Sequence, residues 1–366
     1  MLCFVDDSIP GITRKRKGSY WQYFAPDGSR IAERDEIDRL NAIGMPPAYE
    51  NCWFCPYPEG HIQAMGYDAK GRKQYRYHLA FRAQQEQAKY ERLAEFGRAL
   101  SKLRKRIEAD LTKKPTSFEA VVAAVVRLID ETQIRVGNEE YAKTNKSFGA
   151  TTLRNRHAKV ERGKLKLSYT GKHGVKRTVV LTDKRLTKIA RKTQELPGQH
   201  LFEYVDGDGQ VHPVTSSDVN AYIKEATGGD FTAKDFRTWG ASVIAFGEMA
   251  RRAKEHGRIR LKTVMEPVAE ALGNTPAISR KSYVHPALIE AAKDAGALGS
   301  RKLPRATKWL SSAERGLIEF LDLLPQEQEK LEQEVETRAR NKTESKAAAR
   351  KEIAEEAAKR LENEAA

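Results

Sequence analysis

The spacing of hydrophobic residues changes near residue 80. Before it, short alternating runs separated by turn residues predict β-strands, as in Ser19–Phe24 followed by the turn Pro26–Gly28. After it, hydrophobic residues recur at three- and four-residue steps, as in amphipathic helices. The first such run comprises Tyr90, Leu93, Phe96, Leu100, Leu103 and Ile107. The pattern predicts an α+β protein with a small β-rich N-terminal domain (1–80) and a larger, mainly α-helical domain (81–310).

The last strand of the β-rich part, Arg72–His78, is unusually polar. Strict alternation places Lys73, Tyr75 and Tyr77 on one face and Arg72, Gln74 and Arg76 on the other. Such a strand suits a DNA groove, where Gln and Arg read base edges while Lys and Tyr hold phosphates. It equally suits an edge strand that Lys and Arg protect from aggregation. The residues alone favour neither interpretation.

A β-hairpin is predicted inside the helical domain. Leu165, Leu167 and Tyr169 alternate, the turn residues Thr170–Gly174 follow, and a second alternating run ends at Leu181. The pattern places Lys172 at or near the hairpin tip. Lysines at tips are usually solvated, but one on a rigid two-stranded arm can reach into a groove.

Two arginines lie near predicted helix ends. A helix that begins with the capping box Thr116–Glu119 ends shortly before Arg135, which could simply neutralise its terminal carbonyls. A second capping box, Thr232 with Asp235, starts a long helix and places Arg237 near its N-terminus. A cation is unfavourable there, so a bound anion would explain that placement better.

A break between two helices precedes a tyrosine. Gly273 is the residue type that ends helices in the left-handed conformation, and Thr275 with Pro276 restarts a helix. Asn274 at the break and Tyr283, about two turns further, can reach one small anionic group. Because a tyrosine hydroxyl has a pKa of about 10, a reactive one needs neighbouring cations.

Charge points to a polyanionic partner. The chain has 65 Lys and Arg against 50 Asp and Glu, a net charge of +15. Residues 326–366 hold 9 basic and 11 acidic residues, so the first 325 carry +17. This excess favours nucleic acid as the partner over a basic surface without such a role. Residues 311–366, rich in Glu, Lys, Arg and Ala, are predicted to form a charged helical C-terminal extension.

Several other classes of protein do not fit. No apolar run reaches the roughly 18–20 residues of a membrane span, and the N-terminus carries Asp6 and Asp7 without a signal-peptide core, so we expect a cytoplasmic protein with no membrane partner. Cys52 and Cys55 have zinc-knuckle spacing but no second Cys/His pair, and Asp206–Gly209 lacks the other ligands of a calcium loop. With no Walker-type loop either, we expect neither metal nor cofactor.

Four ordered blocks of the chain resemble the type IB DNA topoisomerases, especially their short poxvirus and bacterial branch. The blocks are Gln133–Asn138, Gly171–Lys172, Lys234–Gly240 and Gly273–Tyr283, while Gly71–His78 resembles the DNA-touching strand of that branch. The resemblance covers roughly residues 15–300. It implies a clamp around duplex DNA that relaxes supercoils by transient single-strand cleavage, a 3′-phosphotyrosyl intermediate, strand rotation and religation, without ATP or metal. It also implies a monomer associated with the nucleoid that prefers supercoiled DNA.

The resemblance also implies roles for single residues. Tyr283 matches the nucleophile, and Arg135 and Arg237 match the arginines that hold the scissile phosphate. Lys172 matches the general acid for the departing 5′ oxygen. Implied DNA contacts are Arg72, Lys73, Gln74, Tyr75, Tyr77, Tyr141 and Lys234. Asn274 departs from the poxvirus enzymes, which carry histidine there; we expect a neutral hydrogen-bond donor, because an amide cannot carry charge.

Two alternatives stay open on sequence. Tyrosine recombinases share the Arg, Lys, Arg and Tyr chemistry, but they usually have histidine where this chain has Lys234, and they generally begin with a helical domain. A non-catalytic DNA-binding protein would instead use Tyr283 as a core residue. Relaxation of supercoiled DNA without a partner site, and its loss in a Tyr283→Phe variant, separates these possibilities.

Overall fold

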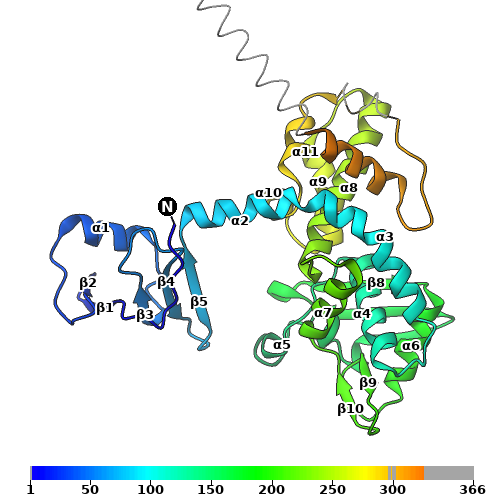
Figure 1. Cartoon of the computed structure of the whole chain (residues 1–366), viewed down its shortest axis with the longest axis horizontal. Coiled ribbons are helices and arrows are strands. Elements are labelled where there is room, and N and C mark those ends of the chain that lie inside the picture. The colour runs from blue at the N-terminus through cyan, green and yellow to red at the C-terminus, as the bar shows by residue number, and fades with distance from the viewer. Residues whose placement is uncertain (1, 296–297, 299–301, 325–366) are drawn as a thin grey trace, which may run out of the picture. The chain divides into compact units, whose positions relative to one another are not determined.

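The computed structural model describes residues 2–295, 298 and 302–324. The chain divides into two compact units, one ending at Arg92 and the other beginning at Leu93 (Figure 1). The first unit is rich in β-strands and the second is mainly helical with small sheets, so the expected α+β fold class is confirmed. Among the helices of the described residues, none combines the length and the apolar character that a bilayer span requires.

The first unit is built on a five-stranded antiparallel sheet in the order β2-β1-β3-β4-β5. Its elements are β1 (Ile12–Lys17), β2 (Tyr20–Phe24), α1 (Arg34–Ala42), β3 (Glu50–Phe54), β4 (Ile62–Tyr67), β5 (Lys73–Tyr77) and α2 (Leu79–Glu91). Phe54 and Ala64 on the central strands are fully buried and share a core with Leu40 of α1. Strand β5 pairs with β4 at one edge of the sheet.

The second unit is organised around helix α4 (Phe118–Thr132). Residues 120–126 of this helix are all fully buried, as expected for a helix that is hydrophobic on every side. Its N-cap is Ser117 and not the predicted Thr116: the Ser117 side chain accepts from the Ala120 N–H and its carbonyl accepts from Val121, while the Thr116 carbonyl accepts from Val205 outside the helix. The other helices are α3 (Leu93–Asp110), α5 (Glu139–Asn145), α6 (Lys184–Gln194), α7 (Ser216–Thr227), α8 (Ala233–His256), α9 (Leu261–Leu272), α10 (Pro276–Ser282) and α11 (Pro286–Ala291).

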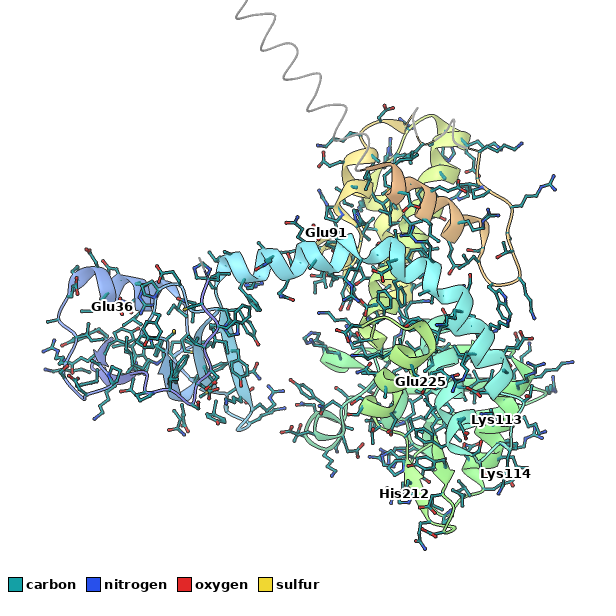
Figure 2. The ribbon with its side chains drawn as sticks, in the orientation of Figure 1. Glu36, Glu91, Lys113, Lys114, His212 and Glu225 are labelled. Carbon is teal, nitrogen blue, oxygen red and sulfur yellow. The ribbon has the colours of Figure 1, made fainter. Side chains whose placement is uncertain are left out.

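Two small antiparallel sheets complete this unit. Strands β7 (Lys164–Thr170) and β8 (Lys176–Leu181) form the predicted hairpin, and β6 (Ala158–Glu161) adds a third strand beside β7. Strands β9 (Glu203–Val205) and β10 (Val211–Pro213) flank the turn at Asp206. The Asp206 carboxylate accepts backbone N–H groups of its own turn and pairs with His212 at 2.7 Å, so this segment is a hairpin turn and not a calcium loop. Figure 2 labels His212 on β10.

The chain after α11 returns to the core of the second unit. Residues 312–324 form a helix whose Leu317, Phe320 and Leu321 are buried in the same hydrophobic core as α3, α4 and α8. This helix falls within the stretch assigned on sequence to the charged extension. Residues 325–366 of that predicted extension lie outside the described residues.

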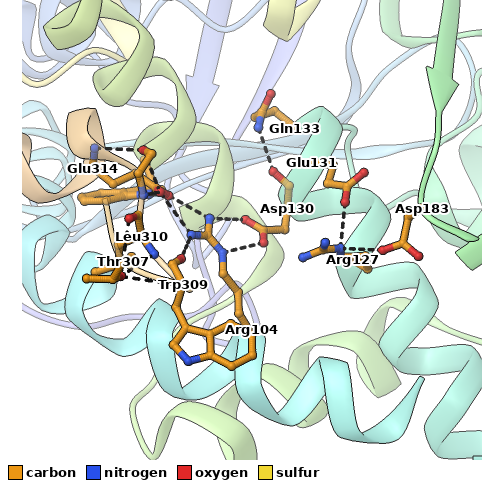
Figure 3. A network of polar contacts seen from close by, with 12 residues as sticks. Arg104, Arg127, Asp130, Glu131, Gln133, Asp183, Thr307, Trp309, Leu310 and Glu314 are labelled. Carbon is orange, nitrogen blue, oxygen red and sulfur yellow. Dashed lines mark hydrogen bonds and ion pairs between the residues drawn. The ribbon is translucent and has the colours of Figure 1, made fainter. Parts of the chain in front are cut away.

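A polar network ties this last helix to the centre of the unit (Figure 3). Arg104 of α3 donates to the carboxylates of Asp130 and Glu314, each at 2.8 Å, and these side chains are largely buried. Glu314 also accepts a hydrogen bond from the Trp239 indole at 3.2 Å. The Asp130 carbonyl in turn accepts from the Gln133 amide at 2.9 Å. The network therefore joins residues 312–324 to the end of α4 and the start of α8.

Candidate active site

The second unit contains a pocket of about 350 Å³ where the predicted residues converge. Its lining includes Arg135, Lys172, Arg237 and Tyr283, together with Tyr141 and Lys234. These residues come from distant parts of the sequence: the segment after α4, the β7–β8 turn, the first turns of α8 and the end of α10. Four side chains that the sequence only relates by motif are thus neighbours in space.

The helix break before the tyrosine has the predicted form. Helix α9 ends at Leu272, and Gly273 adopts φ 59°, in the left-handed region. The Thr275 side chain caps α10 and Pro276 is its first residue, so the short helix leads directly to Tyr283 at its end. Local capping chemistry therefore sets the position of the tyrosine relative to the break.

Arg237 is 4% exposed and lies between the ends of two other helices. It donates to the carbonyl of Gln133, the C-cap of α4, and to the carbonyl of Leu272, the last residue of α9, at 3.1 Å. Helix C-termini carry partial negative charge and unsatisfied carbonyls, so they accommodate a buried guanidinium. Its Nε is buried with no hydrogen-bond partner in the described residues, and so a donor is left for a ligand.

The pocket is electropositive. The Arg237 guanidinium carbon lies 4.9 Å from the ring centroid of Tyr283. Burial, followed by the nearby charge of Arg135, lowers the pKa of Arg237 to about 10. Burial alone would raise the pKa of the Tyr283 phenol, but the charges of Arg237 and Arg135 outweigh it and lower that pKa below its usual value. Both shifts indicate a site that favours an anion.

Asn274 is oriented by Arg135, whose Nη2 donates to the Asn274 Oδ1 at 2.9 Å. A guanidinium has no acceptor, so the amide oxygen faces Arg135 and the Nδ2 faces away from it. That Nδ2 is buried, and no acceptor in the part of the chain that the structure describes lies within full hydrogen-bond geometry of it. The amide is still close enough to Tyr283 to help lower the pKa of its phenol. The predicted neutral donor is thus present, and in the described residues it acts on the Tyr283 phenol.

The contacts of Arg135 and Arg237 differ from those that the sequence suggested at their helix ends. Arg135, expected as a possible neutraliser of the α4 carbonyls, contacts Asn274 instead. Arg237, whose place near its own helix N-terminus looked unfavourable, binds the C-terminal carbonyls of α4 and α9. Tertiary contacts, which the local pattern does not contain, decide both.

Arg177 was not among the predicted site residues. From β8 it donates to the carbonyls of Glu270 at 2.5 Å and Ala271 at 2.7 Å, next to the break at Gly273. It occupies an inward position of the alternation that continues with Val179 and Leu181. An arginine where a hydrophobic residue is expected was the signal that could have identified it.

The other predicted DNA-contacting residues lie at or beside β5 in the first unit. Arg72 pairs with Asp68 at 2.6 Å and Lys73 pairs with Asp7 at 2.6 Å. Gln74 makes a long contact of 3.4 Å to the same Asp68 carboxylate. Tyr75 and Tyr77 are 38% and 41% exposed, with their rings stacked at 5.9 Å between centroids. The two tyrosines thus present open ring surface, while both cations already have carboxylate partners.

Comparison with known proteins identifies relatives of both units. Residues 78–308 match the family described as eukaryotic DNA topoisomerase I, catalytic core, and residues 20–68 match the bacterial DNA topoisomerase IB N-terminal domain. The chain is 32% identical over 287 residues to DNA topoisomerase 1B of Acanthamoeba polyphaga mimivirus, covering 75% of this chain and 85% of that protein. It is 27% identical over 242 residues to DNA topoisomerase 1B of vaccinia virus (strain Copenhagen), covering 63% and 72%.

Among solved structures, the chain has a weak likeness to the XerH site-specific recombinase in a post-cleavage complex. The TM-score is 0.33 at 21% sequence identity, covering 52% of this chain and 50% of that one. A likeness of this size carries no argument about activity. The family matches and the curated relatives identify the family, and they agree with the resemblance found in the sequence. The chain therefore belongs to the type IB DNA topoisomerases.

Proposed function

We propose that this topoisomerase relaxes supercoiled duplex DNA by cutting one strand through a covalent bond between Tyr283 and the 3′ phosphate. The observation that carries the proposal is the pocket that Tyr283, Arg135, Arg237 and Lys172 line together. A nucleophile, two planar cations and an ammonium around one space of about 350 Å³ suit attack on a phosphodiester.

The chemistry is a transesterification. The Tyr283 oxygen attacks phosphorus and forms a new P–O bond while the P–O5′ bond breaks, the phenolic proton passes to water, and Lys172 donates a proton to the departing O5′. Arg135 and Arg237 hold the non-bridging oxygens as charge develops, and the Asn274 Nδ2 donates a third hydrogen bond. One phosphodiester replaces another, so religation by the reverse steps needs no ATP, and no step calls on a metal.

The pKa of Tyr283 supports this role. A phenol with its usual pKa of about 10 is almost wholly protonated at neutral pH and is a weak nucleophile. Because Arg237 and Arg135 lower the pKa of Tyr283 even against burial, a larger share is ionised, and the attacking phenolate is stabilised. The same two cations then neutralise the phosphate, so one pair of side chains serves both reactants.

In the proposed complex the first unit contributes DNA contacts from β5 and the second contributes the chemistry, as a monomeric clamp in which the cut strand rotates. Gln74 reads base edges, and Tyr75 and Tyr77 contact the DNA backbone. Arg72 and Lys73 are paired with carboxylates in the free protein, so each must leave its carboxylate before it can bind a DNA phosphate. Tyr141 and Lys234, which line the pocket, contact DNA next to the cleaved bond.

Plasmid relaxation in the presence of a chelator tests the proposal. The wild-type chain should relax supercoiled plasmid and, after denaturation, leave protein linked to a DNA 3′ end. Tyr283→Phe should do neither, while Tyr204→Phe, which removes a hydroxyl from strand β9 outside the pocket lining, should behave as wild type. Full relaxation by Tyr283→Phe would refute the covalent role, and a requirement for a second specific site would point to a recombinase.

A further inference from the structure

We propose that Arg177 is a positioning residue that holds the turn carrying Lys172 against the helix end carrying Asn274. The inference rests on the proposed function, because it takes Lys172 as the general acid. Lys172 lies on one hairpin and Tyr283 on another segment, so a contact between these segments must keep the acid in place relative to the nucleophile.

The contacts of Arg177 concentrate on the C-terminus of α9. Its Nη1 and Nη2 donate to the carbonyls of Glu270 and Ala271, and the next carbonyl, of Leu272, accepts from Arg237. Three consecutive carbonyls at this helix end therefore receive guanidinium donors from two different parts of the chain. The last carbonyls of a helix lack partners within it and bear partial negative charge, so cations there are stabilising.

Arg177 is firmly connected to Lys172. It follows Lys172 by five residues, and the turn between them is closed by a hydrogen bond from Gly171 N–H to the Val175 carbonyl at 2.8 Å. Arg177 also pairs across the sheet with Tyr169, so the antiparallel ladder fixes its backbone. A guanidinium docked on α9 therefore places the whole turn.

Lys172 itself needs such support. Its side chain is exposed, and within the described part of the chain it makes no hydrogen bond or ion pair. A proton donor that is not held by its own contacts depends on the backbone that carries it. Arg177 also packs against Gly273, since a Cβ built there would lie 3.0 Å from the Arg177 Nη1. Arg177 thus contacts both the turn that carries Lys172 and Gly273, the residue before Asn274.

An arginine is required for this contact. A planar fork serves two neighbouring carbonyls at once, whereas a lysine offers a single point of charge. The position lies inward with Val179 and Leu181, where a hydrophobic side chain would pack without bringing a further positive charge close to Arg237. The presence of arginine at this electrostatic cost fits a specific use of the fork.

The test uses a duplex in which sulfur replaces the bridging O5′ of the scissile phosphate. A thiolate leaves without protonation because thiols have a pKa near 8.5, far below that of an alcohol. Arg177→Ala should slow single-turnover cleavage of the ordinary duplex by about 10²-fold, within the usual contribution of a general acid. On the sulfur duplex it should cleave within a few-fold of wild type, and Arg177→Lys should show the same selective defect, but smaller.

The controls separate this inference from the proposed function. Lys176→Ala removes one positive charge from the preceding position of β8, on the opposite face of the sheet, and this variant should cleave both duplexes like wild type. Lys172→Ala should be slow on the ordinary duplex and recover on the sulfur duplex; without that recovery, the assignment of Lys172 as the acid is wrong. If Lys172→Ala recovers but Arg177→Ala or Arg177→Lys is equally slow on both duplexes, or slow on neither, only the role of Arg177 is overturned.

Discussion

Arg237 is a buried cation whose described partners are two backbone carbonyls and the face of an aromatic ring. Burying a charge without a counter-ion is costly, and the pKa of about 10 expresses that cost, because the charged form is disfavoured. A phosphate in the pocket would supply the missing negative charge. We therefore expect DNA binding to stabilise the second unit by more than contact area alone suggests, since it removes a cost already present in the free enzyme.

Asn274 is expected to contribute as a donor of fixed orientation. Asn274→Ala should lower single-turnover cleavage by about 10²–10³-fold, the usual effect of losing one oxyanion donor. Asn274→His should retain much of the rate, because an imidazole can also donate. Asn274→Asp should be worse than alanine, since its carboxylate can still accept from Arg135 but faces the phosphate with negative charge.

The pH dependence of the same series is the control. An amide does not titrate, so the Asn274 enzyme should show no step near the ordinary histidine pKa of about 6.5. In Asn274→His the rate should fall as the pH rises through the pKa of the new histidine, because the imidazolium loses its charge. Wild-type cleavage by Asn274→Ala would remove this residue from the mechanism.

The elements that carry the site were largely predictable, because their ends are set by local chemistry. The capping box of Thr232 with Asp235 and the break at Gly273 both occur as the sequence indicates. What joins these elements was not predictable. The contacts of Arg237 with Gln133 and Leu272 link segments more than thirty residues apart, and no local pattern records such a pairing. The same holds for Arg177 on α9.

Gly273 and Gly257, which follow two different helices, allow a matched test of the contact between Arg177 and the end of α9. Gly273 and Gly257 both follow a helix with positive φ, 59° and 60°, so alanine at either should cost about 1 kcal/mol of stability. A Cβ on Gly257 would meet open space, but on Gly273 it would press on the Arg177 Nη1. Gly273→Ala should therefore lose more stability in denaturant unfolding and should also slow cleavage, whereas Gly257→Ala should cleave normally. Equal effects of the two would show that the Arg177 contact is immaterial.

The folded core of the second unit extends beyond the residues that match the topoisomerase family. That match ends at residue 308, yet the helix at 312–324 buries Leu317 and Phe320 in the common core and brings Glu314 to Arg104. The sequence-based boundary at residue 311 grouped this helix with the charged stretch that follows it, although residues 312–324 are much richer in large apolar side chains than residues 326–366. The network in Figure 3 runs from Glu314 through Arg104 and Asp130 to the α4 end that holds Arg237. The last described helix is thus structurally continuous with the active site.

Two truncations separate this helix from the residues after it. A chain ending at 324 keeps every described contact and should unfold at the same temperature and relax plasmid at the same rate as the full chain. A chain ending at 310 exposes the core, and each large buried side chain it loses is worth about 1.5–3 kcal/mol. It also strips Arg104 of Glu314, and breaking a buried pair costs about 3–5 kcal/mol. Since the free energy of unfolding of a domain is only about 5–15 kcal/mol, this shorter chain should fail to fold cooperatively.

Glu314→Gln in the full chain keeps the apolar contacts, so its stability should fall between those of the two truncated chains. Normal relaxation by the chain ending at 310 would show that the helix is dispensable.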